Sequence, residues 1–214
     1  MLTLPSKKKS EIIVIKSNNS FYTNEELLGI GLKYIGRKVL ISRKASIYSP
    51  ENISIGDNVR IDDFTILSAS GGSIEINNHI HIAAFCNLIG KGGIVMEDYS
   101  GLSSRVSLYS ATDDFSGNFL IGPIMEESFI NVITGRIKLE KYCQIGTSSS
   151  VFPNVVVGEG SILGAHSFTK SNIQPWEIHA GTPAKFLKKR QSGLLKFIPL
   201  MEKKWGRKPS INKD

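Results

Sequence analysis

The sequence predicts an all-β fold, a left-handed parallel β-helix with a short capping helix at each end. The first observation is a run from residue 139 in which an aliphatic or similar side chain returns at every sixth position: Leu139, Ile145, Val151, Val157, Leu163 and Thr169. The second is a small or apolar residue four positions after the first five of them: Cys143, Ser149, Val155, Ser161 and Ser167. Earlier in the chain the same rhythm recurs with slips, which fall at Gly-rich sites, Gly71-Gly72 and 90–93.

A period of six matches neither the 3.6-residue period of an α-helix nor the simple alternation of a half-buried strand. It indicates a short flat strand followed by a bend, and three such strands complete one triangular coil. The recurring aliphatic points inward, and Gly146, Gly158 and Gly164 are expected to relieve crowding at the bends. A β-sandwich also has short strands, but they recur at intervals of about 8–12 residues. Because no coil buries its own apolar face, only the stack is stable.

The chain divides into three parts. Residues 1–34 comprise a polar, basic lead and a capping helix, since Thr23 and Glu26 match a capping box. Residues 35–174 form the solenoid, interrupted by an excursion loop at 109–134 whose phenylalanines are expected to pack on a neighbouring subunit. Residues 175–214 form a last coil, a helix over 194–205 that closes the other end, and a tail.

Composition excludes several classes of protein. The formal net charge of +7 is concentrated near both termini, and no basic stripe interleaved with aromatics suggests nucleic-acid binding. The sequence has no apolar run of about 20 residues that would span a membrane, and no signal peptide is evident, so a cytoplasmic protein is expected. Cys86 and Cys143 both fall on the inward small position, which predicts buried reduced thiols.

The stretch from Leu139 to Arg190 resembles the hexapeptide-repeat acyltransferases, especially the sugar acetyltransferases of bacterial surface-polysaccharide synthesis. Its end, Ala180-Gly181-Thr182-Pro183-Ala184-Lys185, is similar to the signature that closes the solenoid in this family. The stretches ISIGDNVRIDDF and LSSRVSLYSATDDFSG are most similar to a subgroup that acylates the 4-amino group of dTDP-4-amino-4,6-dideoxyglucose for O-antigen or another surface polysaccharide. A sugar O-acetyltransferase of the same fold is the alternative.

The resemblance implies a homotrimer that uses acetyl-CoA as co-substrate and needs no metal. Each active site would lie between two adjacent solenoids, with the excursion loop of one reaching across to the other. By position, Gly146 and Ser148 would line the thioester end of acetyl-CoA. The rest of the cofactor would contact Gly164, Ala165, Thr169 and Lys170, and its phosphates would be neutralised by Lys188 and Arg190.

One departure from the family bears on the chemistry. Many O-acetyltransferases of this family carry a histidine base where the loop starts, but residues 110–114 here read SATDD. A hydroxyl needs a base to attack a thioester, whereas a neutral amine needs less help. Asp114 or Asp113 would hold the amine or an adjacent hydroxyl and accept the proton, unless the pair is only a turn or cap. A backbone N–H on the solenoid would stabilise the oxyanion.

His79 and His81 leave further hypotheses open. On a strand both would face outward on the same side, and His81 is the second candidate for a base or a substrate contact. The pair also suggests a γ-carbonic-anhydrase-like zinc site, although a third histidine ligand has no obvious source. A non-catalytic scaffold is the remaining alternative, and titration with acetyl-CoA would distinguish it.

Overall fold

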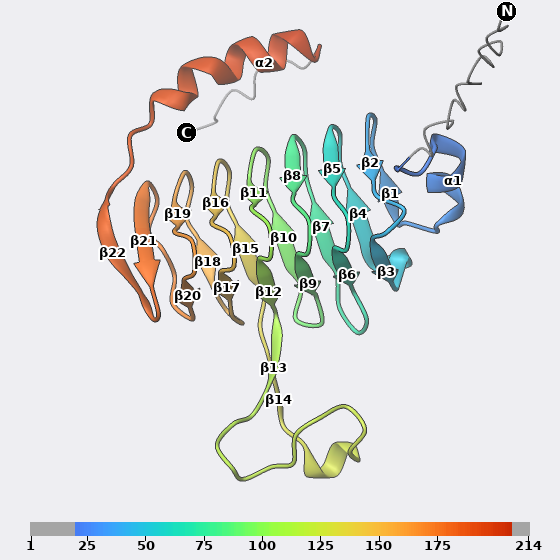
Figure 1. The fold of residues 1–214 in the computed structure, drawn as a ribbon, viewed down its shortest axis with the longest axis vertical. Helices are drawn as coiled ribbons and strands as arrows, with labels where there is room; N and C mark the ends of the chain where they lie inside the picture. The colour runs from blue at the N-terminus through green and yellow to red at the C-terminus, as the bar shows by residue number, and fades with distance from the viewer. Residues whose placement is uncertain (1–19, 207–214) are drawn as a thin grey trace, which may run out of the picture.

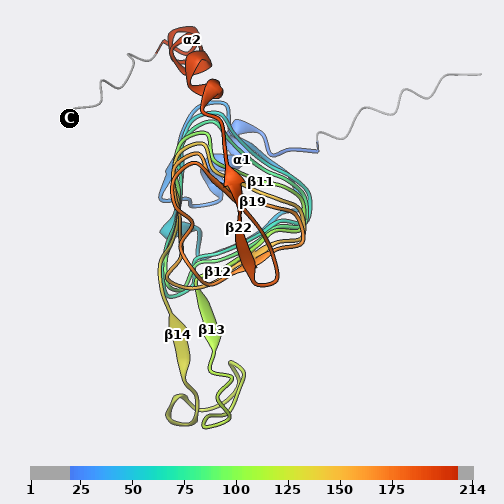
Figure 2. The same ribbon diagram turned by 90° about the vertical axis from the view of Figure 1, so that its left-hand side faces the viewer.

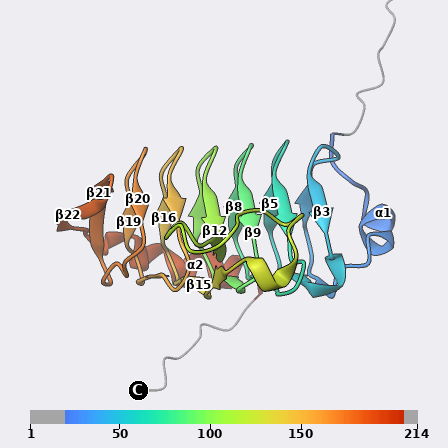
Figure 3. The same ribbon diagram turned by 90° about the horizontal axis from the view of Figure 1, so that it is seen from below.

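The computed structural model describes residues 20–206, so the predicted lead and most of the predicted tail lie outside the described residues. It confirms the predicted fold class: the chain winds as a left-handed parallel β-helix with three flat faces (Figure 1). Seen from below, the strands of successive coils lie side by side as parallel rungs along one axis (Figure 3).

The first face is a parallel sheet of six strands, stacked in the order in which the coils follow one another. Its strands are β1 (Tyr34–Ile35), β4 (Ile53–Ile55), β7 (Ile74–Ile76), β10 (Ile94–Met96), β15 (Ile137–Leu139) and β18 (Val156–Val157). In β7, Ile74 and Ile76 are buried and Glu75 is exposed. This alternation is what the pleat of a strand produces when one side faces a core.

The second face is a sheet of eight strands. Its strands are β2 (Leu40–Ile41), β5 (Val59–Ile61), β8 (Ile80–Ile82), β11 (Gly101–Leu102), β16 (Gln144–Ile145), β19 (Ile162–Leu163), β21 (Glu177–Gly181) and β22 (Ala184–Lys189). All neighbours pair in parallel except β21 and β22, which form an antiparallel hairpin at the C-terminal end of the stack. The hairpin therefore covers the last parallel strand of this face.

The third face is a sheet of six parallel strands. Its strands are β3 (Ser46–Tyr48), β6 (Ile66–Ser68), β9 (Asn87–Ile89), β12 (Ser107–Tyr109), β17 (Ser150–Val151) and β20 (Phe168–Thr169). We call the bend between the first and second faces the first corner, and that between the second and third faces the second corner. The third corner leads from the third face to the first face of the next coil.

The recurring side chains form the core as predicted. Ile145, Val151 and Leu163 are fully buried, as are most of their counterparts in earlier coils, whereas Ile35 and Ile47 of the first coil are partly buried. The inward small residues are also buried, and their hydroxyls find backbone partners: Ser149 donates to the carbonyl of Gly164 at 2.7 Å. Because buried polar groups need such partners, small hydroxyl residues suit the crowded corners.

The bends show where glycine is needed. At most bends of the first and second corners, the third residue after an inward aliphatic takes a left-handed conformation, and it is seldom glycine; Phe64 and Ser148 have φ of 59° and 56°. Gly146 comes earlier in the bend and faces the next coil, since a Cβ on it would lie 2.4 Å from the backbone nitrogen of Ala165. The crowding that this glycine relieves therefore arises between coils, not from a positive φ.

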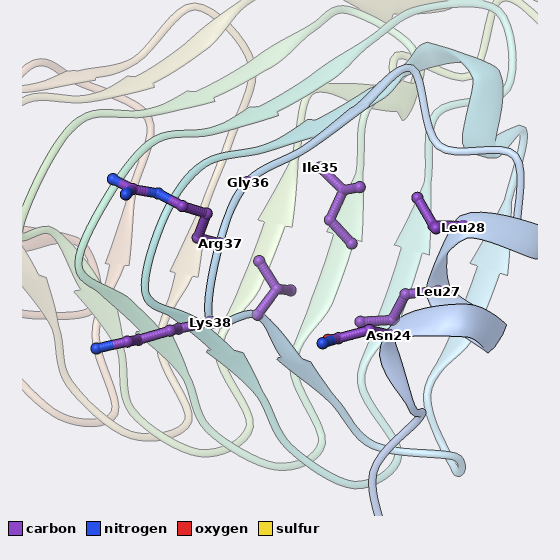
Figure 4. A pocket seen from close by; sticks show the side chains of 8 residues that line it. Asn24, Leu27, Leu28, Ile35, Gly36, Arg37 and Lys38 are labelled. Carbon is purple, nitrogen blue, oxygen red and sulfur yellow. The ribbon is translucent and has the colours of Figure 1, made fainter.

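The predicted N-terminal cap is present. Helix α1 (Asn24–Gly29) begins at Thr23, whose hydroxyl accepts the N–H of Glu26 while the Glu26 carboxylate accepts the N–H of Thr23. Leu27 is buried in the core at the end of the solenoid. A cavity of about 290 Å³ lies between this helix and the first coil. Figure 4 shows its lining side chains, among them Leu28 and Ile35. A hydrogen bond to Arg43 is the main reason that the pKa of Glu26 is lowered to about 2.

The C-terminal helix exists, but the prediction that it closes the other end is wrong. After η3 (Gly193–Phe197), α2 (Ile198–Lys204) runs back along the first corner (Figures 1 and 2). Glu202 accepts a hydrogen bond from the Tyr99 hydroxyl at 2.7 Å, and the Trp205 ring packs perpendicular to the His79 ring. The β21–β22 hairpin occupies the end instead, because it continues the sheet hydrogen bonds that a helix would leave unmade.

The excursion leaves at the third corner, at the end opposite to α2 in Figure 2. Its stem is an antiparallel pair of strands, β13 (Ala111–Asp113) and β14 (Val132–Thr134). A short η2 (Glu127–Phe129) lies near its tip, and another 3-10 turn, η1 (Pro50–Asn52), lies in the first coils. Several large apolar side chains of this loop are exposed on the single chain: Phe115, Phe119, Leu120, Ile121, Ile124 and Phe129.

Both cysteines are buried thiols, as predicted. Burial raises the pKa of Cys86 to about 11 and that of Cys143 to about 12. A thiol that stays protonated is a poor nucleophile, so neither residue suits covalent catalysis.

The stacked core makes a quantitative prediction. Ile82→Ala empties part of a fully buried column, so we expect the free energy of unfolding to fall by about 2–5 kcal/mol in urea titrations. The matched control is Leu28→Ala, whose side chain is 74% exposed and whose loss should change stability by no more than about 0.5 kcal/mol. Equal effects of the two substitutions would contradict this account of the core.

Candidate active site

Four of the predicted acetyl-CoA contacts lie together at the second corner. Gly146 and Ser148 follow β16, while Gly164 and Ala165 follow β19 in the next coil. The N–H of Gly146 donates to the carbonyl of Leu163 at 2.7 Å, which holds the two bends in register. The neighbouring coils require both glycines, since a Cβ on Gly146 would lie 2.4 Å from the nitrogen of Ala165 and one on Gly164 would lie 2.8 Å from the Cβ of Ala180.

The other predicted acetyl-CoA contacts lie elsewhere. Thr169 is buried and its hydroxyl donates to the carbonyl of Ser171, so its side chain faces the core instead of a ligand. Lys170 is exposed at the third corner, and Lys188 is exposed on β22. A single chain therefore does not gather the predicted set on one surface.

Arg190 is a poorer phosphate ligand than its sequence position suggests. Its guanidinium donates to the carbonyls of Tyr142 and Gly160 at 2.9 and 2.7 Å. Both carbonyls belong to the first corner, away from Gly146 and Ser148. Burial lowers the pKa of Arg190, and its hydrogen bonds to the backbone indicate a role in fastening the C-terminal segment.

His81 is held by a carboxylate. Its Nε2 lies 2.7 Å from Oδ2 of Asp62, and the other oxygen of Asp62 accepts a hydrogen bond from Arg60. Hydrogen bonds from His81 and Arg60 lower the pKa of Asp62, although burial, the largest influence, acts in the opposite direction. The imidazole is exposed on the outer side of the second face, so the geometry suits an oriented base or a substrate contact.

His79 does not share that surface, contrary to the sequence prediction. It lies at the first corner with φ of 59°, where its ring stacks on Tyr99 at 4.7 Å and its Nδ1 meets the side chain of Asn58. The bend comes between the two histidines and turns them apart. Among residues 20–206, no group of three metal-binding side chains is close enough to hold an ion.

Ser103 and Ser104 are candidates that the sequence reasoning missed. They occupy the second-corner positions equivalent to Gly146 and Thr147, one coil nearer the N-terminus. The carbonyl of Ser104 accepts the Thr147 hydroxyl at 2.7 Å and the N–H of Ser148 at 3.0 Å. Their position in the six-residue repeat could have identified them, because it lies one coil before the residues predicted to line the thioester of acetyl-CoA.

The two loop aspartates differ in environment. The Asp114 carboxylate accepts the N–H of Ser116 at 2.7 Å and the side-chain amide of Asn131 at 2.8 Å, which ties together the two sides of the loop. These hydrogen bonds lower the pKa of Asp114, the one from the Ser116 backbone most strongly. The carboxylate of Asp114 is therefore positioned within the loop, as the turn-or-cap alternative describes.

Asp113 instead lines a cavity at the base of the loop. The cavity has a volume of about 380 Å³, and Lys91, Met125 and Glu127 also border it. The stem strands β13 and β14 border this cavity and hold it beside the third corner. On one chain this cavity is separated from Ser104 by the whole of strand β12, so the two groups of candidates lie at opposite ends of the third face.

Comparison with known proteins gives the family. No family model matches the sequence. A dTDP-4-amino-4,6-dideoxy-D-glucose acyltransferase from Escherichia coli is 42% identical over 172 residues, which is 80% of this chain and 90% of that protein. The chain belongs to the hexapeptide-repeat acyltransferases.

Solved structures agree with this assignment. AntD, an N-acyltransferase from Bacillus cereus, superposes with a TM-score of 0.84 at 46% identity over 87% of this chain and 99% of its own; one of its structures contains dTDP-4-amino-4,6-dideoxyglucose and coenzyme A. A putative lipopolysaccharide biosynthesis O-acetyl transferase from Escherichia coli K12, WbbJ, is 25% identical over 70% of this chain and 74% of that protein. This hexapeptide-repeat protein is therefore an enzyme that transfers acyl groups.

Substitution of each loop aspartate should separate an effect on turnover from an effect on the stability of the loop. Asp113→Asn should lower turnover without loosening the loop, because its carboxylate has no hydrogen-bonding role in closing it. Asp114→Asn should lower turnover and also speed hydrogen exchange across 115–131, because it weakens the clamp to Asn131. Steady-state kinetics and hydrogen exchange by mass spectrometry would test this, and unchanged turnover in both variants would place the base elsewhere.

Proposed function

We propose that this enzyme transfers an acetyl group from acetyl-CoA to the 4-amino group of dTDP-4-amino-4,6-dideoxyglucose, for use in a surface polysaccharide such as an O-antigen. The observation that carries the proposal is the similarity, at 46% identity over nearly all of its length, to AntD, whose structure holds this amino sugar with coenzyme A. Both co-substrates are cytoplasmic metabolites, so we place the enzyme in the cytoplasm.

The site suits an amine better than a hydroxyl. Residues 110–114 carry two carboxylates and no histidine at the base of the loop. The neutral amine attacks the thioester carbonyl, the carbon–sulfur bond breaks, and the coenzyme A thiolate leaves. The surplus ammonium proton passes to a carboxylate and finally to the departing sulfur, and a backbone N–H of the second corner stabilises the oxyanion.

The proposed site needs two subunits. Gly146, Ser148 and Ser104 lie at the second corner, whereas Asp113 and Lys170 lie at the third. A homotrimer with parallel axes sets the second corner of one subunit against the third corner of the next, and this unites the groups. The exposed apolar side chains of the excursion loop would then be buried against the neighbour, which supports the same arrangement.

The variants solved for AntD support the role of the loop aspartates. They include substitutions of one serine and of one aspartate ten positions further along. In this sequence a serine precedes an aspartate by that interval only at Ser103–Asp113 and Ser104–Asp114. Both pairs join the second corner to the base of the loop, where the proposed reaction occurs.

A thiol-release assay tests the proposed function. The purified enzyme should release free coenzyme A with dTDP-4-amino-4,6-dideoxyglucose, and not with the 4-hydroxy sugar or simple galactosides. Because one AntD structure contains 3-hydroxybutyryl-CoA, both this donor and acetyl-CoA belong in the panel. Acylation of hydroxyl acceptors alone would favour the O-acetyltransferase alternative, which the similarity to WbbJ represents. No turnover and no coenzyme A binding would favour a scaffold.

Lys170 provides a test of the cofactor site. We expect Lys170→Ala to weaken binding of coenzyme A about tenfold, because one charged contact to phosphate is lost. The melting temperature should not change, since the side chain is exposed. Lys33→Ala removes the same charge at the far end of the solenoid and is the matched control in calorimetric titrations. Equal affinities of the two variants would refute the predicted contact.

A further inference from the structure

The exposed side of the C-terminal helical segment departs from the pattern of an ordinary surface helix. η3 and α2 together form one helical segment, residues 193–204, along the first corner. Its inward side chains are partly buried and recur at helical spacing: Leu194, Ile198, Met201 and Trp205. The exposed side of a surface helix is usually polar. Here Leu195, Phe197 and Leu200 remain 39%, 55% and 65% exposed, although the packing on the solenoid does not use them.

The charges on this exposed side are positive. They belong to three exposed lysines: Lys196, Lys203 and Lys204. The Nζ of Lys196 lies 5.0 Å from the centre of the Phe197 ring, so charge and apolar surface are adjacent. The acid of this segment, Glu202, turns inward and accepts the hydrogen bond of the Tyr99 hydroxyl. The exposed side therefore combines apolar side chains with positive charge that the segment itself does not compensate.

The positive charge extends past both ends of the helix. Residues 185–206 contain seven basic side chains and one acidic side chain. Where α2 ends, a cavity of about 180 Å³ is lined by Arg37, Lys38, Lys204 and Trp205. Arg37 is paired with Asp57 at 2.9 Å, whereas the ion pairs within residues 20–206 include neither Lys38 nor Lys204. Cations that converge on one cavity suit a phosphate group, which they neutralise through charged hydrogen bonds.

The place of α2 leaves this surface accessible in the proposed trimer. There the second and third corners face neighbouring subunits, so the first corner points away from the threefold axis. α2 protrudes from the solenoid at the first corner and runs along its length (Figures 1 and 2). A protruding helix does not enclose a partner, but it lies well against a flat, extended surface.

A bilayer that contains anionic lipids is the flat surface that this chemistry fits. A helix at a membrane surface lies in the plane of the interface, with its apolar side chains at the acyl boundary and its lysines among the headgroups. The carbon chain of a lysine packs along apolar surface while its ammonium stays in the polar layer. Each basic residue near an anionic membrane strengthens binding about fivefold. Apolar and basic side chains on the same exposed side thus act together on such a membrane.

We propose that the exposed side of this segment is a membrane-contact surface that favours anionic lipids. Its residues, which we call the α2 outer face, are Leu195, Lys196, Phe197, Leu200, Lys203 and Lys204. The cavity beside Trp205 accepts the phosphate of a headgroup. Because α2 follows the length of the solenoid, the contact holds the solenoid axis parallel to the bilayer. This inference goes beyond the proposed function and does not depend on the identity of the acceptor.

Co-sedimentation of the full-length enzyme with lipid vesicles tests this inference. Phosphatidylcholine vesicles with about 30% phosphatidylglycerol should bind the enzyme about tenfold or more tightly than pure phosphatidylcholine vesicles, because only the former are negatively charged. Sodium chloride at about 0.5 M should remove most of that difference, since it screens charges at a surface.

Two substitutions separate the charged from the apolar contribution. Lys203→Glu should weaken binding to the anionic vesicles about tenfold or more, because it reverses one charge of the α2 outer face. Lys33→Glu is its matched control, since it makes the same change at an exposed lysine near the third corner. Leu200→Ser should weaken binding about fivefold by removing an apolar contact. Leu28→Ser, at a side chain that is 74% exposed on α1, is the control for that loss.

The melting temperature and the rate of acyl transfer without vesicles should match the wild type in all four variants, because each changed side chain is exposed. A wild-type enzyme that binds neither kind of vesicle, or equal losses in the variants and their controls, would overturn this inference and leave the proposed function intact. If Leu200→Ser instead dissolves an assembly larger than a trimer in light scattering, the α2 outer face is a contact between copies of the protein and the inference is wrong. Absence of acyl transfer to the nucleotide sugar would overturn only the proposed function.

Discussion

The structure depends on one constraint: each coil must hydrogen-bond to, and bury its apolar side chains against, the coils on either side. The inward columns, represented by Ile82 and Leu163, are completely shielded from water. Parallel pairing fixes the spacing of successive coils at about 4.8 Å, so any backbone atom that deviates collides with its neighbour. Gly146 shows how tight the limit is, because a single methyl group would lie 2.4 Å from the next coil.

This rigidity turns the three corners into surfaces with different uses. The first corner is filled by its own chain, where α2 packs through Glu202 and Trp205. The third corner bears the excursion loop, with its stem and its aspartates. The second corner carries Gly146 and Gly164 toward the C-terminus and the stacked rings of Phe64 and Phe85 toward the N-terminus.

The proposed chemistry divides between the rigid solenoid and the excursion loop. In the proposed reaction the solenoid supplies fixed backbone donors, which preorganise a site without needing to move. The loop supplies carboxylates, of which Asp114 is engaged in holding the loop closed while Asp113 borders a cavity. Attack by an amine makes modest demands on a base, and a loop without a histidine suits that demand.

The sequence by itself determined the fold, because a side chain at every sixth position has only one way to stay buried along the chain. It also determined the two buried thiols and the capping box at Thr23, since these depend on local spacing. Only the tertiary structure decided that α2 lies along a corner, that His79 and His81 part at a bend, and that Arg190 is bound to carbonyls. These outcomes depend on which corner each residue occupies and on what the chain brings there from distant segments. Periodicity along the sequence describes a column of side chains, but it does not describe what lies across from that column.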